Sequence, residues 1–326
     1  MPVRPPLEPA LAQAAGLLQQ AQQVLVVSHI RPDGDAVGSL LGLGLGLQNL
    51  GKQVQMVLED GIPPNLRHLP GSEQVRRSPS GTFDLVCVVD CSDLQRTGSV
   101  LLNRPLPDLN IDHHRTNLDF ARHNLVDQRA VSTTEIVAAV LRHLGAPLTP
   151  PVASALLTGL VTDTIGFRTS NISPHALRLA AELSEAGADL PALYYRALVS
   201  KSFEAARLWG AGLAKIQRDA RLVWTALSLE DRQQAGYPGR DDADLVNLLS
   251  AIDETDIAVI FIEQPDGKVK VSWRAQPGFD VSDVAVSFGG GGHAAAAGAE
   301  INGSLAEVQV TVLAQTRPLL TGEHHV

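Results

Sequence analysis

The stretch VVSHIRPDGDAVGSLLG, residues 26–42, decides the fold because it joins a strand to a helix. Its β-branched, apolar beginning predicts a buried strand, and this strand stops at His29. Asp33 and Asp35 follow two positions apart, and the next apolar run predicts a helix over 36–50. The junction therefore brings an imidazole and two carboxylates to the end of a strand, where ligands bind in open α/β sheets.

The same alternation of strand and helix continues along the first part of the chain. Strand patterns lie at residues 23–28, 53–60, 83–90 and 108–112. Helical patterns follow at residues 132–145, 150–164 and 173–187. Strands that alternate with helical or loop crossovers predict an α/β fold, with a mostly parallel sheet flanked by helices.

The last third of the chain has a different pattern. A strand is expected at 221–228, and the tripeptide PDG predicts a hairpin turn between strands at 256–264 and 268–275. These features predict a smaller α+β domain. The expected division is a first domain at 1–188, a helical linker at 189–214 and the smaller domain at 215–326.

The glycine-rich stretch FGGGGHAAAAG, residues 288–298, lies in this smaller domain. Four glycines before an alanine run predict the start of a helix, where uncovered backbone N–H groups form an anion site. Arg274 and His293 are expected to add contacts to a phosphate there. A second glycine-rich run, LLGLGLGLQNL at 40–50, lacks the dinucleotide-binding spacing, and its glycines are expected to permit tight helix–sheet packing.

Composition limits the class of protein and of ligand. The chain has 326 residues, 44% of them hydrophobic, and no apolar run near the ~20 residues of a membrane span, so we expect a soluble cytoplasmic protein. Cys87 and Cys91 are expected to be buried thiols in a reducing compartment. A net charge of −9 argues against long duplexes as partners, and 4% aromatic residues argue against a base-stacking track for long single strands.

Carboxylates and imidazoles gather at the carboxyl ends of the expected strands. The residues that share this edge of the sheet are His29, Asp33, Asp35, Asp90, Asp112, His113, His114 and Asp163. Packed carboxylates repel one another, so a positive group must compensate them. Oxygen and imidazole ligands without cysteine suit Mn²⁺ or Mg²⁺, with Fe²⁺ or Co²⁺ as further choices. Two ions about 3.5–4 Å apart that share a carboxylate would use this number of ligands.

Five motifs, in this order, resemble those of one known family. HIRPDGD (29–35), the aspartate that ends VCVVD (86–90), DHH (112–114) and GLVTDTIGF (159–167) resemble the four motifs of the DHH phosphoesterase superfamily. FGGGGHAAAAG resembles the glycine-rich motif of the DHH-associated C-terminal domain. The resemblance covers nearly the whole chain. Its layout is most similar to the nanoRNase and pAp phosphatase type, in which pAp is 3′-phosphoadenosine 5′-phosphate.

The resemblance implies a role for each residue of this sheet edge. One Mn²⁺ would be held by His29, Asp33 and Asp90. The other Mn²⁺ would be held by Asp35, Asp90, His113 and Asp163. Asp90, which both ions share, and His114, which would face the substrate phosphate, are the implied catalytic residues. Asp112 would orient its neighbours, and Mg²⁺ or Co²⁺ could substitute for Mn²⁺. In the smaller domain, the implied phosphate-binding residues are Arg274, Gly290, Gly291, Gly292 and His293.

The implied activity is Mn²⁺-dependent phosphoester hydrolysis by a water that the two ions activate. The substrates would be short single-stranded RNA or DNA oligonucleotides, cut to 5′-mononucleotides, and pAp, cut to AMP. They would bind in a cleft between the two domains. Relatives are often dimers, so a homodimer is among the expected partners, whereas membranes and long duplexes are not.

Other activities share this metal site. A stand-alone cyclic-dinucleotide phosphodiesterase is the main alternative, because nothing in the sequence separates it cleanly. A RecJ-like exonuclease usually carries an additional domain and more positive charge, and a family II inorganic pyrophosphatase lacks the GGGGH motif. A non-catalytic nucleotide-binding protein is disfavoured, because every ligand position holds a competent residue.

Overall fold

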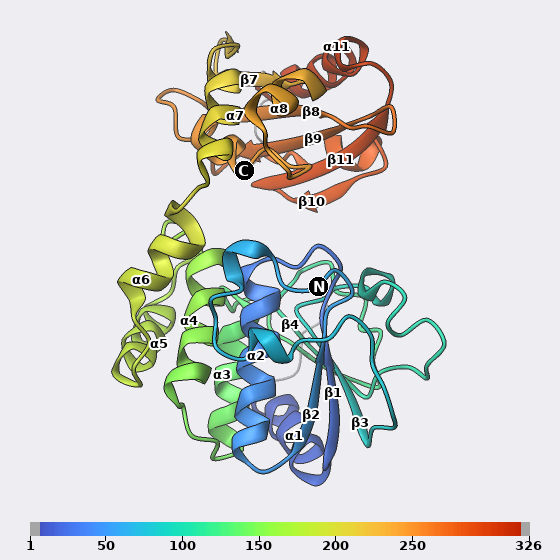
Figure 1. The fold of residues 1–326 in the computed structure, drawn as a ribbon, viewed down its shortest axis with the longest axis vertical. Coiled ribbons are helices and arrows are strands. Elements are labelled where there is room, and N and C mark those ends of the chain that lie inside the picture. Colours follow the sequence, from blue (N-terminus) through green and yellow to red (C-terminus); the bar gives the residue numbers. More distant parts are fainter. Residues whose placement is uncertain (1–6, 321–326) are drawn as a thin grey trace. The chain divides into compact units, whose positions relative to one another are not determined.

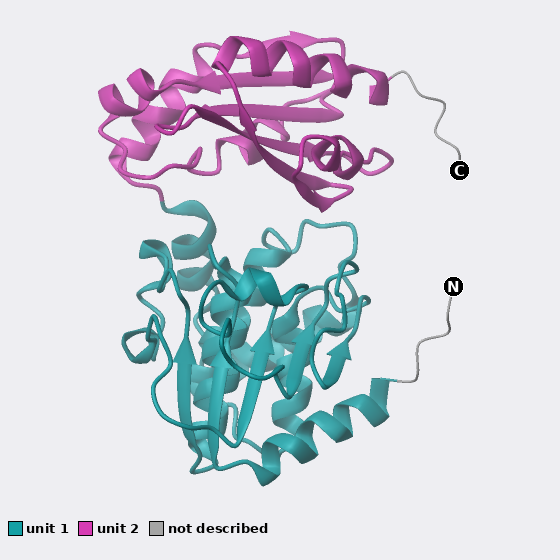
Figure 2. Cartoon of the chain, turned by 90° about the vertical axis from the view of Figure 1, so that its right-hand side faces the viewer, with its two compact units in different colours: residues 1–200 teal, residues 201–326 magenta. Residues whose placement is uncertain are grey.

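The computed structural model describes residues 7–320, which form two α/β units (Figures 1 and 2). Unit 1 is Met1–Ser200 and unit 2 is Lys201–Val326. Within the described residues, no helix has both the length and the apolar content that a membrane crossing requires. Both cysteines are buried and unpaired, as expected.

The helical linker expected at 189–214 is not a segment of its own. Its first part, α6 (Leu190–Tyr194), buries Leu193 in the core of unit 1. Its second part, α7 (Phe203–Leu213), buries Leu208 in a core of unit 2. The division between the units falls inside the expected linker, because apolar side chains on its two sides join different cores.

Unit 1 contains a five-stranded sheet in which all strands are parallel. In spatial order the strands are β2 (Gln53–Val57), β1 (Gln23–Val27), β3 (Leu85–Val89), β4 (Leu109–Asp112) and β5 (His123–Val126). Parallel strands have their carboxyl ends at one edge, which fixes where the polar side chains that follow them meet. β5 was not expected, because the sequence HNLV is too short and polar to stand out as a strand.

One face of this sheet packs against helices and the other against loop segments. Residues of β1 alternate between the two faces, so Val26 joins the cluster with the helices and Val27 joins the cluster with Val100 and Leu101. The remaining helices of unit 1 are α1 (Leu7–Gln20), α2 (Gly34–Asn49), α3 (Thr133–His143), α4 (Pro150–Asp163) and α5 (Pro174–Glu185). Short 3-10 helices lie at η1 (Pro64–Leu66), η2 (Ser72–Gln74) and η3 (Leu94–Thr97), and η4 (Tyr195–Val199) is a π-helical turn.

Helix α2 lies beside α3 and α4, and glycines allow the close approach (Figure 1). A Cβ atom on Gly38 would lie only 2.6 Å from the carbonyl oxygen of Ala155 in α4. The sequence predicted helix–sheet packing for the later glycines of this helix. Gly44 does face Met56 of β2, but Gly42 faces α4 instead. The glycines therefore set the spacing between helices as well as between helix and sheet.

Unit 2 contains a six-stranded mixed sheet in the spatial order β10-β11-β9-β8-β7-β6. The strands are β6 (Gln217–Asp219), β7 (Leu222–Leu227), β8 (Ile257–Glu263), β9 (Lys268–Ala275), β10 (Gly291–His293) and β11 (Ala296–Asn302). The other elements are α8 (Leu229–Ala235), α9 (Leu245–Leu249), α10 (Ser282–Ser287), α11 (Leu305–Thr316) and η5 (Arg317–Leu320). Both faces of β8 are buried, because Phe261 packs in one apolar cluster and Ile260 in another.

The glycine-rich stretch of unit 2 is a β-hairpin, and the prediction of a helix start there was wrong. β10 and β11 pair in antiparallel register, with Gly292 opposite Ala297, and β11 continues the sheet beside β9. Gly292 has a φ of 147°, and a Cβ atom there would collide with the carbonyl oxygen of Ala296. The helix propensity of the alanine run is overridden by pairing with β9, which buries Ala297 and Ala299. No helix N-terminus is therefore available at this position to bind an anion.

Candidate metal centre

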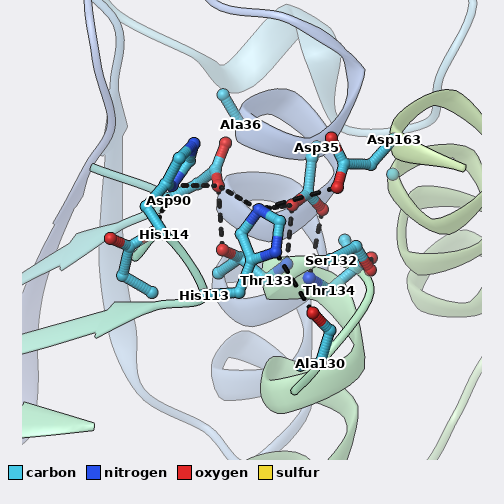
Figure 3. A network of polar contacts seen from close by, with 12 residues as sticks. Asp35, Ala36, Asp90, His113, His114, Ala130, Ser132, Thr133, Thr134 and Asp163 are labelled. Atoms are coloured by element: carbon cyan, nitrogen blue, oxygen red, sulfur yellow. Dashed lines mark hydrogen bonds and ion pairs between the residues drawn. The ribbon is translucent and has the colours of Figure 1, made fainter. Parts of the chain in front are cut away.

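The six predicted metal ligands come together at the carboxyl edge of the sheet in unit 1, four of them labelled in Figure 3. In each of three groups, the possible donor atoms lie within 4.8 Å of one another. The groups are His29 with Asp33 and Asp90, Asp35 with His113 and Asp163, and Asp90 with His113 and His114. The first group is the set assigned to one ion from the sequence, and the second is the set assigned to the other ion apart from Asp90, which lies 3.9 Å from His113. Their role as ligands stays a prediction, but the side chains are in place for it.

The first group forms where β1 and β3 end. Nε2 of His29 lies 3.6 Å from Oδ2 of Asp90, and both side chains are almost fully buried. Nδ1 of His29 lies 2.9 Å from the carbonyl oxygen of Ile30, which is an acceptor only. Nδ1 therefore carries the proton, and the lone pair of Nε2 is directed at the group. Asp33 caps α2 with Oδ1, which accepts from the N–H groups of Asp35 and Ala36.

The second group is centred on His113. Its Nε2 lies 3.9 Å from Oδ2 of Asp35, 3.6 Å from Oδ2 of Asp163 and 3.9 Å from Oδ1 of Asp90 (Figure 3). Nδ1 donates toward the carbonyl oxygen of Ala130 at 3.3 Å, which again leaves Nε2 as the inward atom. Asp90 thus faces His29 with one carboxylate oxygen and His113 with the other. This arrangement suits a carboxylate that two ions share.

Asp90 has an unusual backbone conformation for a residue that directly follows a strand. Its φ is 52°, in the left-handed region, and its N–H still donates to the carbonyl oxygen of Ile111 at 2.9 Å. Aspartate tolerates this region better than most residues, yet the conformation persists only where neighbours hold it. The sharp turn after β3 points the carboxylate toward the ligand groups.

The start of α3 holds the two most buried carboxylates among the proposed ligands, those of Asp35 and Asp90. The N–H of Thr133 donates to Oδ2 of Asp35 at 2.6 Å, and the N–H of Thr134 donates to Oδ1 at 3.1 Å. The hydroxyl of Thr133 donates to Oδ1 of Asp90 at 2.8 Å. Sequence reasoning missed Thr133 and Thr134. The sequence pattern that could have identified them is the helix start STTE at 132–135, because the N-terminus of a helix attracts negative charge.

Asp112 and His114 form a pair beside the shared carboxylate. Nδ1 of His114 donates to Oδ1 of Asp112 at 2.7 Å, and Nδ2 of Asn117 donates to Oδ2 at 2.6 Å. Asp112 has no exposed surface, so its carboxylate is committed to these partners. The geometry is that of a residue that orients its neighbour, because the bond at Nδ1 fixes the direction of the His114 ring.

The electrostatics of the centre favour a bound cation. Burial, followed by the charges of Asp90, Asp163 and Asp33, raises the pKa of Asp35 well above its ordinary value. Burial is also the main reason that the pKa of Asp163 rises to about 7. Within residues 7–320, no lysine or arginine forms an ion pair with these carboxylates. Carboxylates that cannot all ionise unaided, arranged with two imidazoles, fit divalent cations such as Mn²⁺.

The histidines compensate part of this charge. Burial lowers the pKa of His114, but the hydrogen bond to Asp112 and the charge of Asp90 outweigh it and raise the pKa to about 9. For Asp90, burial raises the pKa, whereas the neighbouring His29, His114 and His113 lower it, with a net lowering. The shared carboxylate is therefore ionised at neutral pH, as a bridging ligand must be.

The predicted phosphate-binding residues form a row within unit 2. Arg274 in β9 is opposite Ala296 in β11, and Ala296 is opposite His293 in β10. The guanidinium of Arg274 donates to Oδ1 of Asn247 at 2.9 Å and to the carbonyl oxygen of Trp273 at 3.0 Å. His293 is exposed. Gly290, Gly291 and Gly292 approach β11 closely or lie at the hairpin edge, and their contact with a phosphate stays a prediction.

Comparison with known proteins identifies the same two-part organisation. Residues 23–160 match the DHH family, N-terminal domain, and residues 225–315 match the DHHA1 domain. The chain is 35% identical, over 305 residues, to the bifunctional oligoribonuclease and PAP phosphatase NrnA of Thermus thermophilus, with 91% of this chain and 90% of the relative covered. It is 28% identical to the protein of the same name from Mycoplasma pneumoniae, with 89% and 91% covered.

Solved structures share the fold. The chain resembles an exopolyphosphatase-related protein from Bacteroides fragilis with a TM-score of 0.87 and 24% identity, over 97% of this chain and 98% of that chain. RecJ of Thermus thermophilus, solved in complex with Mn²⁺, has a TM-score of 0.56 and 19% identity, over 98% of this chain and 55% of that chain. Both similarities concern the fold, and the bound Mn²⁺ is a property of RecJ.

Proposed function

Because the chain belongs to the DHH family, we propose that it is a metal-dependent phosphoesterase that hydrolyses short oligonucleotides and 3′-phosphoadenosine 5′-phosphate. The observation that carries this proposal is Asp90, which has one carboxylate oxygen toward each of two ligand groups. The relative from Thermus thermophilus, whose name states both activities, covers nine tenths of the chain and supports the choice of substrates.

The two activities require the same bond to be broken. Release of a 5′-mononucleotide from an oligonucleotide and removal of the 3′-phosphate from pAp both cleave a P–O3′ bond. In each case the oxygen of a water forms a new bond to phosphorus, and the 3′ oxygen leaves and takes up a proton. A single centre can therefore process both substrates, provided that it binds the phosphoryl group on the 3′ oxygen.

The proposed cofactors are two Mn²⁺ ions, with Mg²⁺ or Co²⁺ as substitutes. The proposed ligands of one ion are His29, Asp33 and Asp90. The proposed ligands of the other ion are Asp35, Asp90, His113 and Asp163. When bound, the ions would supply the positive charge that polarises a phosphoryl oxygen and lowers the pKa of the attacking water.

The chain itself contributes orientation and charge. The N–H groups at the start of α3 hold Asp35 in one orientation, and the hydroxyl of Thr133 does the same for Asp90. Asp112 fixes the ring of His114 through Nδ1 and stabilises its protonated form. Nε2–H of His114 would then donate to a phosphoryl oxygen that gains negative charge during the attack. In unit 2, Arg274, His293 and the glycines at 290–292 are proposed to bind a further phosphate of the substrate.

A substrate panel tests the proposed function. We would incubate the protein with pApA, pAp, cyclic di-AMP, pyrophosphate and a 20-mer, each with Mn²⁺ and each with chelator. We expect hydrolysis of pApA to AMP and of pAp to AMP and phosphate, only with Mn²⁺. Faster turnover of cyclic di-AMP than of pApA or pAp would favour the alternative activity, that of a cyclic-dinucleotide phosphodiesterase. Absence of hydrolysis with any phosphoester would contradict the proposal.

A further inference from the structure

An arginine lies beside the loop of His29 and has no role in the site as described so far. Arg96 belongs to η3, the turn Leu94–Thr97 that follows β3. The N–H of Ile30 donates to the carbonyl oxygen of Arg96 at 2.7 Å. This hydrogen bond fixes the main chain of Arg96 next to the residue that follows a proposed metal ligand.

The turn that carries Arg96 is held on both sides. At its start, the carboxylate of Asp93 accepts from the N–H of Gln95 at 2.9 Å. At its end, Gly98 has a φ of 67°, and the carboxylate of Glu59 occupies the space that a side chain at Gly98 would need. Glu59 accepts from both the N–H and the hydroxyl of Ser99, each at 2.8 Å. The side chain of Arg96 therefore starts from a rigid position at the rim of the metal centre.

The guanidinium of Arg96 has no acidic partner within residues 7–320, and none of its N–H groups forms a hydrogen bond there. It is nevertheless half-buried. The surface arginines Arg122, Arg129 and Arg221 each pair with an aspartate. A partly buried cation that lacks a carboxylate is left with unused donors, which an anionic ligand can satisfy.

The main chain places Arg96 beside the proposed metal centre. Its hydrogen-bond partner Ile30 directly follows His29, which belongs to one proposed ligand group. Its turn η3 comes shortly after β3, the strand that ends just before Asp90. Arg96 therefore lies next to the place where the phosphoryl group of a substrate would bind, on the side of η3.

We propose that Arg96 is a substrate-binding residue that donates hydrogen bonds to the phosphoryl group positioned at the metal centre. This inference rests on the proposed phosphoesterase function and adds a phosphate contact from unit 1 to those proposed in unit 2. A planar guanidinium offers two parallel N–H donors, which match two oxygens of one phosphoryl group. The alternative is that Arg96 only offsets the negative charge of the ligands.

The test compares Arg96→Gln and Arg96→Lys with Arg122→Gln, which alters a surface arginine paired with Asp108. We would measure kcat and KM for pApA at saturating Mn²⁺. Calorimetry would give the affinities of the Mn²⁺-loaded proteins for AMP and adenosine, and the affinity for Mn²⁺ alone. AMP carries the phosphoryl group cleaved in pApA, whereas adenosine lacks it.

We expect Arg96→Gln to lower kcat/KM and the affinity for AMP by about 10- to 100-fold, the range of one charge-assisted hydrogen bond. The affinities for adenosine and for Mn²⁺ should not change, Arg96→Lys should recover part of the loss, and Arg122→Gln should match the wild type. The proposal is overturned if kcat/KM and the AMP affinity of Arg96→Gln stay within twofold of the control, or if a loss of Mn²⁺ affinity accounts for the defect. Failure of the wild type to hydrolyse any phosphoester would instead contradict the proposed function, and AMP binding would still report on Arg96.

Discussion

The hydroxyl of Thr133 donates to Oδ1 of Asp90 at 2.8 Å and connects the start of α3 to the carboxylate that both ligand groups share. The same residue donates its N–H to Asp35 at 2.6 Å. Thr133 has no exposed surface. One buried residue thus orients a carboxylate from each of the two proposed ion sites, without being a ligand itself.

The first prediction concerns this hydroxyl. Thr133→Val keeps the size of the side chain and the main-chain N–H but removes the donor to Asp90. We expect the affinity for Mn²⁺ to fall by about 10- to 100-fold, as for other groups that orient metal ligands. Thr133→Ser, which keeps the hydroxyl, should stay close to the wild type. Calorimetric titration with Mn²⁺ measures both variants, and equal affinities for the valine and serine variants would contradict the assigned role.

The second prediction concerns the shared carboxylate. Asp90→Asn removes the negative charge that would bridge two ions, so we expect Mn²⁺-dependent hydrolysis of pApA to fall by about 100-fold or more. Asp119→Asn is the matched control, because Asp119 has a similar left-handed φ of 51° but is exposed and outside the ligand groups. Initial rates of pApA hydrolysis at saturating Mn²⁺ are measured for both variants and for the wild type. Ordinary activity in Asp90→Asn would rule out a bridging role.

Sequence reasoning predicted that the proposed metal ligands lie close together because one rule of topology acts over long distances. In a parallel sheet, every strand ends at the same edge, so His29, Asp90 and His113 are brought together although they are far apart in the chain. The same rule says nothing about what supports these side chains. Thr133 contacts Asp35 across 98 positions from the start of a helix, and only the packing of α3 reveals that contact.

Sequence reasoning failed where local preference and tertiary pairing disagreed. The run AAAAG has high helix propensity, and no local signal indicates a strand. The pairing of β11 with β9 supplies a full set of backbone hydrogen bonds and a buried place for Ala297. The position of the boundary between the units inside the expected linker was not predicted, because polarity along the chain does not show which core a helix will join.

The third prediction concerns the packing of α2 against α4. Gly38→Ala would place a methyl group 2.6 Å from the carbonyl oxygen of Ala155, and a backbone atom cannot move away as a side chain can. We expect the free energy of unfolding to fall by about 1–3 kcal/mol, as in other overpacked cores. Urea denaturation of unit 1, within the full-length protein, measures the change.

Gly16→Ala provides the control for this variant. Gly16 also lies within a helix, α1, but a Cβ atom there would meet nothing within 4 Å. The higher helix propensity of alanine should make this variant as stable as the wild type or more stable, by up to about 1 kcal/mol. A similar loss of stability in both variants would show that close packing of α2 on α4 is not the cause.

The fourth prediction concerns unit 2. His293 is exposed at the tip of β10, in the row that contains Arg274. If this row binds a phosphate of the substrate, His293→Ala should raise KM for pApA by about tenfold, the value of one hydrogen bond to a charged group. The affinity for Mn²⁺ should not change. His143→Ala, which alters a surface histidine of unit 1, serves as the control, and equal KM values in the two variants would remove His293 from the binding site.

The fifth prediction concerns the stability of the metal-free protein as a function of pH. Burial raises the pKa of Asp163 to about 7, from an ordinary value of 3.8, and raises the pKa of Asp35 as well. Between the ordinary and the raised value, the folded state binds more protons than the unfolded state, so stability falls as pH rises. The pKa of His114 is raised from 6.5 to about 9, so this residue makes stability fall further between pH 6.5 and pH 9. The lowered pKa of Asp90 changes stability only below pH 3.8.

We therefore expect Tm in chelator to fall by several degrees between pH 5 and pH 9. Saturating Mn²⁺ should remove most of this dependence, because the cations compensate the ionised carboxylates. Asp163→Asn removes one of the groups with a raised pKa, so the metal-free variant should lose less stability between pH 4 and pH 7 than the wild type. Thermal denaturation across this range, with each protein at one ionic strength, provides the measurement. An identical pH profile for Asp163→Asn and the wild type would mean that repulsion among these carboxylates does not limit the stability of the metal-free fold.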